Sequence, residues 1–379
     1  MTFIVSTIQT INVENVQVFL GQSTQLVGLF FQAISMIFTY AYFKRSKAVY
    51  YVAVNCAITC VINVAKIVYH SPRPYYLILQ EIQVYNCDYQ FGNPADIPFI
   101  CSCLVSVILQ DLFTSNPNLN PTNKILISFF GIGTVLTTCL VRVYNMASSF
   151  DQIFFALELG ILLAMFLHNN VQSIIVKHID TILEVDQYYQ FIYNYIVMST
   201  GLFLSGMGML TLVYSYSDLT FFVPPVWISN IYYFCKVNEI ERWSFSARCL
   251  IEGSLMAVGF GAYLGCVFQA KVIGQNITST NLTWQGTFRL IMAFAIFVFC
   301  AIPYLSNPNI SDLRIATLIY TLIPSFAYGF VVFGLLDILY KFTPFYYSQS
   351  FGNSNKNLSN QLLLQSRNQQ QIELIVLEI

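Results

Sequence analysis

Long apolar stretches recur along this chain with short polar segments between them, and each is close to the roughly 20 residues that a helix needs to cross a membrane. The stretches are continuously apolar and show no period-two alternation, so the pattern predicts helices rather than the strands of a barrel. We expect nine membrane-spanning helices, at about 18–42, 48–69, 98–114, 124–145, 152–174, 190–214, 246–270, 284–305 and 313–340.

Composition agrees with this pattern and excludes other classes of protein. Hydrophobic residues make up 56% of the 379 residues and charged residues only 9%, too few for a soluble domain of this size. The net charge of −1 provides no electrostatic basis for nucleic-acid binding. We therefore predict an all-α, polytopic membrane protein that does not bind nucleic acid.

One aromatic stretch, 221–234, does not fit the pattern of spanning helices. Pro224 and Pro225 interrupt it, and several charged residues follow it closely. Because proline in a helix interior removes a hydrogen bond and clashes with the preceding turn, we expect an interfacial loop here rather than a tenth spanning helix.

Loop cations predict the orientation of the chain, because lysine and arginine concentrate on the cytoplasmic side. Under the nine-helix count they place the N-terminus outside or in a lumen and the C-terminus in the cytosol. Cys87 and Cys235 then fall in lumenal loops, where they could form a disulfide, although we favour two free thiols. No cysteine or histidine spacing indicates a metal site, and we predict no cofactor.

Three cations lie at the ends of predicted helices on the lumenal side. Lys66 and Arg73 form the pattern Lys-x6-Arg-Pro at the end of the second helix, and Arg142 ends the fourth. Helical spacing would place positions 66, 70 and 73 on one face. Between these segments runs the loop Cys-Asp-Tyr-Gln-Phe-Gly-Asn-Pro-Ala-Asp-Ile, 87–97.

Together these segments resemble the three signature motifs of the type 2 phosphatidic acid phosphatase superfamily: Lys-x6-Arg-Pro, Pro-Ser-Gly-His and Ser-Arg-x5-His-x3-Asp. The resemblance covers about residues 66–155. It is strongest to the glucose-6-phosphatase-like branch, because of the Cys-x4-Gly-x-Pro lead-in to the second motif, Gln152 in place of aspartate, and the nine-helix length with an aromatic lumenal loop.

The resemblance implies roles for matching residues and a division of the chain. Lys66, Arg73 and Arg142 would bind phosphoryl oxygens, Gln152 would orient a nucleophile, and Pro94 matches the proline of the second motif. Residues 1–175 would form a phosphatase-like membrane core of five helices and 176–345 four further spanning helices with the aromatic lumenal loop. A polar tail rich in Asn, Gln and Ser follows at 346–379.

The departures from the family pattern remove the side chains that would catalyse phosphate transfer. Ile97 replaces the histidine acid and has no proton to donate, and Ser148 replaces the histidine nucleophile without an adjacent general base. Asp96 replaces glycine and adds a negative charge where an anion would bind. Two further motif serines are lost, to Ala95 and Val141.

A substitute nucleophile is available in sequence only at His70, which lies near the cations on the lumenal side. In-line attack requires the nucleophile behind the phosphorus, opposite the leaving group, which makes this substitution a minor alternative. His168 and His178 belong to the opposite end of the fifth helix, where we expect no catalytic role.

We therefore predict a pseudophosphatase without catalytic histidines, acting as a membrane scaffold, a complex subunit or a binder of anionic lipid. The expected partners are membrane lipids, including an anionic phospholipid in the cationic pocket, and proteins of a membrane complex. The alternative is an active phosphatase of altered chemistry that hydrolyses a lipid or sugar phosphomonoester. The resemblance implies the endoplasmic reticulum, with the mitochondrial inner membrane as the alternative.

Overall fold

The computed structural model describes residues 31–77, 87–184, 189–236, 244–273, 284–306 and 312–336, and within these ranges the chain forms helices and connecting segments with no strand. Eight helices among them are long and apolar enough to cross a membrane: Arg45–Leu77, Asp96–Ser115, Pro121–Tyr144, Phe150–Leu183, Tyr193–Thr220, Ser246–Ala270, Gly286–Tyr304 and Leu313–Leu335.

These eight helices coincide with the predicted segments from 48–69 onward, so the prediction of an all-α polytopic membrane protein is confirmed. Of the first predicted helix, 18–42, only 31–42 lies within the described residues, and that part is helical. The polar tail at 346–379 lies outside them.

The individual elements follow one another as α-helices broken by short 3-10 or π-helical turns. Their bounds are α3 Arg45–Tyr69, α4 Pro74–Leu77, α5 Asp96–Ser115, α6 Pro121–Tyr144, α7 Phe150–Phe166, η1 Leu167–Val171, α8 Gln172–Glu184, α9 Tyr189–Thr220, α10 Pro225–Cys235, α11 Ser246–Gly253, η2 Ser254–Met256, α12 Ala257–Ile273, α13 Trp284–Ser306, α14 Leu313–Thr317, η3 Leu318–Leu322, α15 Ile323–Phe330 and η4 Val331–Leu335.

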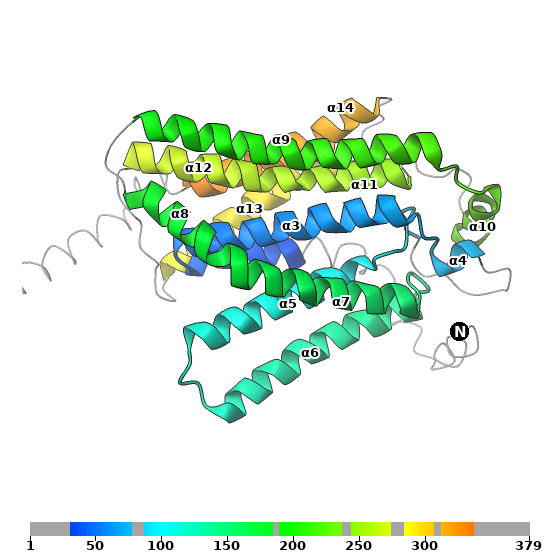
Figure 1. Ribbon diagram of the computed structural model, residues 1–379, viewed down its shortest axis with the longest axis horizontal. Coiled ribbons are helices and arrows are strands. Elements are labelled where there is room, and N and C mark those ends of the chain that lie inside the picture. The colour runs from blue at the N-terminus through cyan, green and yellow to red at the C-terminus, as the bar shows by residue number, and fades with distance from the viewer. Residues whose placement is uncertain are drawn as a thin grey trace, which may run out of the picture.

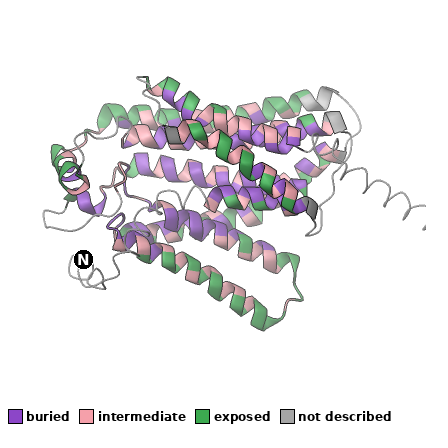
Figure 2. Cartoon of the chain, turned by 180° about the vertical axis from the view of Figure 1, so that it is seen from behind, coloured by how far each residue is buried: buried purple, intermediate pink, exposed green. Residues whose placement is uncertain are grey.

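Helix α3 lies at the centre of the bundle (Figure 1), with α5, α6 and α7 on one side and α9, α11 and α12 on the other. Tyr50 and Ile58 of α3 pack with Phe99 of α5 in one buried apolar cluster. Exposed positions concentrate on α6 and α9 (Figure 2), where apolar side chains cover the outer surface. Such a surface suits lipid contact.

Helix α12 packs tightly against the segment α15–η4 through glycines. An added Cβ at Gly261 would lie 2.1 Å from the carbonyl oxygen of Phe326, and one at Gly329 would lie 2.2 Å from that of Val258. Small residues let two helix backbones approach closely in a membrane, where packing rather than hydrophobic exclusion holds helices together.

The aromatic stretch at 221–234 is not a loop as predicted, because most of it forms α10. Pro224 is the N-cap and Pro225 the first helical residue, a position where the fixed φ and missing N–H of proline suit helix initiation. Both prolines therefore start a helix instead of breaking one. At 11 residues, α10 is too short to span a membrane.

The boundary that we predicted at residue 175, between the phosphatase-like core and the four further spanning helices, falls inside α8. Helix α7 continues through the π-helical turn η1 into α8, and Phe150–Leu183 forms one membrane-spanning helix. Helix α8 packs on α3 and α12.

Candidate functional site

Helix α3 ends before the chain reaches Arg73. Helix α3 ends at Tyr69, and His70 adopts the left-handed conformation with φ 46°, its N–H bonded to the carbonyl of Lys66. Pro72 and Pro74 keep the following residues from resuming α3. The predicted shared helical face of 66, 70 and 73 is therefore wrong.

His70 instead points toward α9. Its Nε2 lies 2.6 Å from the hydroxyl oxygen of Ser217, and its ring stacks on Phe221 with 4.1 Å between the ring centroids. The imidazole therefore contacts α9 and the residue that follows it.

Lys66, Arg73 and Arg142 converge on one carboxylate, that of Asp96. The ammonium of Lys66 forms an ion pair with Oδ1 of Asp96, and Nη2 of Arg73 and Nη2 of Arg142 each lie 3.5 Å from its Oδ2. The structure thus brings together the three cations that the motif spacing singled out. We call these four residues the cation cluster.

The three cations are almost completely buried, with exposed fractions of 1% for Lys66, 0% for Arg73 and 1% for Arg142. A buried charge is tolerated where an opposite charge and hydrogen bonds compensate its lost hydration. Asp96 supplies the opposite charge to all three. As the first residue of α5 it also lies at a helix N-terminus, which favours a negative side chain.

A second carboxylate, that of Asp88, also pairs with Nη2 of Arg73, with 2.6 Å between Nη2 and Oδ2. The guanidinium also donates from Nε to the carbonyl of Gln90 at 3.0 Å and from Nη1 to the carbonyl of Ala147 at 2.8 Å. Because a guanidinium holds its donors in a rigid plane, these contacts fix its orientation. The ammonium of Lys66 donates to the side-chain oxygen of Gln90.

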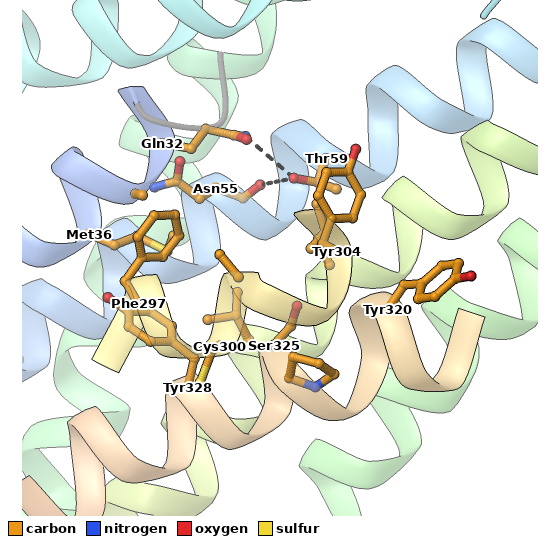
Figure 3. A pocket seen from close by; sticks show the side chains of 15 residues that line it. Gln32, Met36, Asn55, Thr59, Phe297, Cys300, Tyr304, Tyr320, Ser325 and Tyr328 are labelled. Atoms are coloured by element: carbon orange, nitrogen blue, oxygen red, sulfur yellow. Dashed lines mark hydrogen bonds between the residues drawn. The ribbon is translucent and has the colours of Figure 1, made fainter. Parts of the chain in front are cut away.

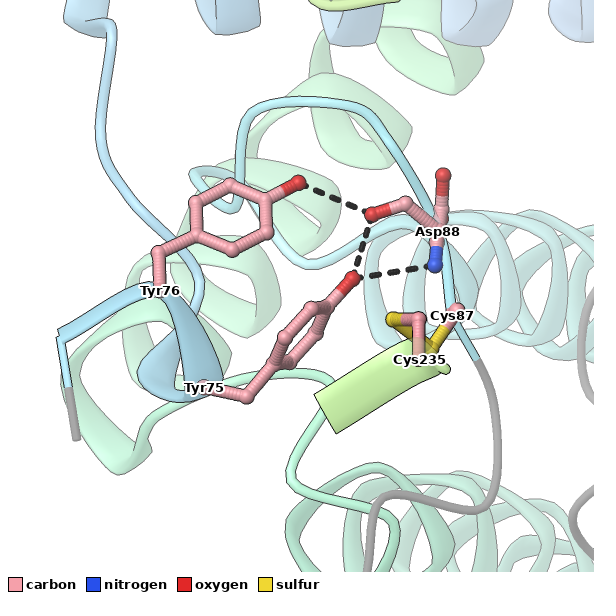
Figure 4. Close-up of a disulfide and its surroundings, with 5 residues drawn as sticks. All are labelled: Tyr75, Tyr76, Cys87, Asp88 and Cys235. Carbon is pink, nitrogen blue, oxygen red and sulfur yellow. Dashed lines mark hydrogen bonds between the residues drawn. A yellow bond between two sulfur atoms is a disulfide. The ribbon is translucent and has the colours of Figure 1, made fainter. Parts of the chain in front are cut away.

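A disulfide between Cys87 and Cys235 ties this loop to the end of α10 (Figure 4), so our preference for two free thiols is wrong. Helix α10 brings the two Cα atoms to 5.9 Å, within the range for a disulfide. Next to the disulfide, the hydroxyls of Tyr75 and Tyr76 donate to the carbonyl of Asp88 at 2.5 and 2.9 Å.

The variant Cys87→Ser should unfold more easily than the native protein, by about 2 kcal/mol or more, because a disulfide with a sequence separation of 148 residues restricts the unfolded chain. Thermal unfolding of the detergent-purified protein measures this loss. Cys60, which is free and only half-buried, offers the matched control, Cys60→Ser, and this variant should unfold close to the native protein. Equal unfolding midpoints for native protein and Cys87→Ser in the absence of reductant would contradict the prediction.

Within the described residues Gln152 forms no hydrogen bond with the side chain of Ser148 but bonds the segment that precedes Arg73. Its Nε2 donates to the hydroxyl of Ser71 at 3.1 Å and to the carbonyl of Pro72 at 2.8 Å, while its Oε1 completes a capping box with Ser149. An added Cβ at Gly92 would lie 2.6 Å from Nε2 of Gln152, so a larger residue there would displace this side chain.

The positions that the resemblance assigns to catalysis are buried but carry no acid or base. Ile97 is 4% exposed and Ser148 is 1% exposed, and within the described part of the chain the Ser148 hydroxyl has no hydrogen-bond partner. Pro94 and Ala95 lead directly into α5 and are likewise buried. A serine hydroxyl without a base is a weak nucleophile.

Asp88 and Gln90 are site residues that the sequence did not single out. Both lie in the loop before Pro94, but neither matches a motif position, and only their contacts with the buried cations identify them. Val141, at a motif position, is half-buried beside Arg142. His168 and His178 lie in η1 and α8, far along the helix from Gln152.

Across the described ranges, no group of three or more His, Cys, Asp or Glu side chains could hold a metal ion. Comparison of the chain with protein-family models, with curated proteins and with solved structures gives no match.

Proposed function

We propose that this integral membrane protein is a catalytically inactive relative of membrane phosphatases that serves as a scaffold or a subunit of a membrane complex. The observation that carries the proposal is the position of Asp96. Its carboxylate pairs with Lys66, Arg73 and Arg142, the side chains to which the resemblance assigns the phosphoryl oxygens. The protein supplies its own anion at this point, and the cation cluster joins α3, α5 and α6.

The neighbouring residues support the absence of catalysis. Ile97 cannot protonate a leaving group, and the Ser148 hydroxyl has no base among the described residues to activate it. A phosphate or a lipid headgroup would have to displace Asp96 and leave that carboxylate without its cations, which opposes anion binding.

The disulfide supports a lumenal orientation for the end of the bundle that carries the cation cluster. Structural disulfides persist in oxidising compartments such as the lumen of the endoplasmic reticulum. We place the protein in that membrane with the cation cluster facing the lumen, and the mitochondrial inner membrane is the alternative location for a complex subunit.

The purified protein should release no inorganic phosphate from phosphatidate or from a sugar phosphate beyond the rate of its Arg142→Ala variant. The reason is that loss of a nucleophile or its acid typically costs about 10⁴-fold or more in rate. Colorimetric measurement of released phosphate, with protein in detergent micelles, tests this expectation.

Two variants distinguish an active phosphatase, which is the alternative function, from the inactive relative that we propose. A rate that falls about 100-fold or more in Arg142→Ala would show that the pocket is an active site. A comparable fall in His70→Ala would identify His70 as the nucleophile, despite its contact with Ser217. Either result would overturn the proposed function.

A further inference from the structure

Glu158 places a carboxylate in the interior of a membrane-spanning helix. It lies in the span Phe150–Leu183, eight positions after its start, which is roughly 12 Å at the rise of an α-helix. Because half of the hydrocarbon layer is about 15 Å thick, Glu158 lies within that layer. Its side chain is exposed, on one helix face with the exposed apolar residues Phe154, Leu162 and Met165. The carboxylate therefore faces out of the bundle within an apolar surface.

The other acidic residues of the eight spans in the described part of the chain fall into two groups. Three form ion pairs with a cation of the chain: Asp96, Asp111 and Glu252. Three lie within three positions of an end of their span: Asp151, Asp180 and Asp218. Glu158 belongs to neither group, since it forms no hydrogen bond or ion pair with the described residues.

Uncharged polar side chains inside the bundle find partners in the same chain. In the pocket between residues 31–42, α3, α13 and α15 (Figure 3), Nε2 of Gln32 donates to the Thr59 hydroxyl at 3.4 Å. Nδ2 of Asn55, which also lines this pocket, donates to the Ser35 hydroxyl at 3.1 Å. A charge inside a membrane is costly, and ionisable residues there are rare and pair with other groups. The carboxylate of Glu158 therefore requires a partner beyond the described residues.

The described cations of this chain do not reach the depth of Glu158 on an exposed face. Outside the cation cluster, the lysines and arginines of the described spans lie within three positions of the start of their span, apart from Lys177. Lys177 lies about 19 positions farther along the same helix than Glu158, which is roughly 28 Å. The first 30 residues contain no lysine or arginine. A second copy that met the first at α7 through a two-fold axis would instead bring two Glu158 carboxylates together.

A further polar side chain, that of Asn169, lies on the same face of this helix. Asn169 follows Glu158 by about three helical turns, is exposed, and likewise forms no hydrogen bond with the described residues. It belongs to the π-helical turn η1, and single π-helical turns frequently occur at functional sites. A helix that packs along this face meets both polar groups.

We infer that the outer face of α7, formed by Phe154, Glu158, Leu162 and Met165, binds a membrane-spanning helix of another protein that carries a lysine or arginine opposite Glu158. Charge complementarity identifies this occupant, because a cation that donates to the carboxylate removes both charges from contact with lipid. The apolar residues of the face pack against the partner helix. The inference goes beyond the proposed function, since a helix docked on α7 is compatible with an inactive or an active cation cluster.

Synthetic single-span helices of leucine and alanine test this surface in nanodiscs that contain the full-length protein. One helix carries a lysine at the depth of Glu158, and the matched helix carries leucine there. Energy transfer between labelled helix and protein should show about fivefold tighter binding of the lysine helix, as expected for one polar contact between helices. Glu158→Gln should remove this preference, and Glu158→Lys should transfer it to a helix that carries glutamate. Asp151→Asn, at an exposed position near the start of the same helix, should keep it.

Equal affinity of the native protein for the lysine and leucine helices would overturn the inference, and so would a preference that persists in Glu158→Gln. The exposed position of Glu158 lets these variants fold, because surface substitutions away from packed contacts change stability little. Oxidation of Leu162→Cys to a disulfide-linked dimer that disappears in the double variant with Glu158→Gln would identify a second copy as the occupant and would also overturn it.

Dicyclohexylcarbodiimide, a reagent that modifies carboxyl groups inside membranes, tests the occupant in the native membrane. Peptide mass spectrometry should find Glu158 unmodified in native membranes and modified after purification into nanodiscs. Equal modification in both would show that Glu158 faces lipid and that no partner helix covers it. Phosphate release has no part in these measurements, so this inference and the proposed function can fail independently.

Discussion

The variant Asp96→Asn loses about 3 to 5 kcal/mol of its free energy of unfolding, as expected when one partner of a buried ion pair is removed. The substitution keeps the shape of the side chain but takes the negative charge away from three cations that are at most 1% exposed. Lys66, Arg73 and Arg142 then repel one another at the end of the bundle. Thermal unfolding of the detergent-purified protein measures the loss.

The control for this variant is Asp151→Asn. Asp151 lies in the first turn of α7 as Asp96 lies in that of α5, but it is exposed, so its loss should cost about 0.5 kcal/mol or less. Equal unfolding midpoints for native protein and Asp96→Asn would contradict the central place of this carboxylate.

Thermal unfolding of the same two proteins in the presence of inorganic phosphate tests the proposed function. If Asp96 acts as the internal anion, millimolar phosphate should raise the unfolding midpoint of Asp96→Asn and leave that of the native protein unchanged, because a ligand that binds only the folded state stabilises it. Stabilisation of the native protein by phosphate would show instead that the cation cluster binds external anions while Asp96 is present.

Replacing Gly261 by valine destabilises the protein by about 3 kcal/mol, the upper part of the range for overpacking. The added Cβ would lie 2.1 Å from the carbonyl oxygen of Phe326 and 2.9 Å from the amide nitrogen of Phe330. These neighbours are backbone atoms, so α12 and α15 must separate along their length to make room. The unfolding midpoint in detergent again provides the measurement.

Gly201→Val is the matched control, because an added Cβ at Gly201 in helix α9 would meet no atom within 4 Å beyond the backbone of its own helix turn. Both variants carry the same unfavourable helix propensity of a β-branched residue. The difference between them therefore isolates the clash. If the two variants unfold at the same temperature, the close approach of α12 and α15 does not contribute to stability.

The spanning helices were predictable because their cause is local. A segment inside a membrane must satisfy its own backbone hydrogen bonds, so a long apolar stretch is sufficient to specify a helix. This reasoning did not predict helix α10. Whether Pro224 and Pro225 break a helix or begin one depends on their position relative to its first turn, and composition does not reveal that position.

The site was predictable only in part. The spacing of Lys66, Arg73 and Arg142 correctly placed three cations at one end of the bundle, but His70 left the expected helical face when α3 ended in a left-handed residue. Gln152 holds Ser71 and Pro72, a contact between segments about 80 residues apart that no local pattern encodes.

The sequence by itself determined the membrane-spanning character of the protein, the order of its spanning helices and the absence of histidine from positions 97 and 148, since hydropathy and residue identity are properties of the chain. Only the tertiary structure decided that Asp96 lies among all three cations, that Cys87 reaches Cys235 and that Asn55 lines a cavity. Each of these depends on the distance between residues far apart in sequence, which the packing of whole helices sets.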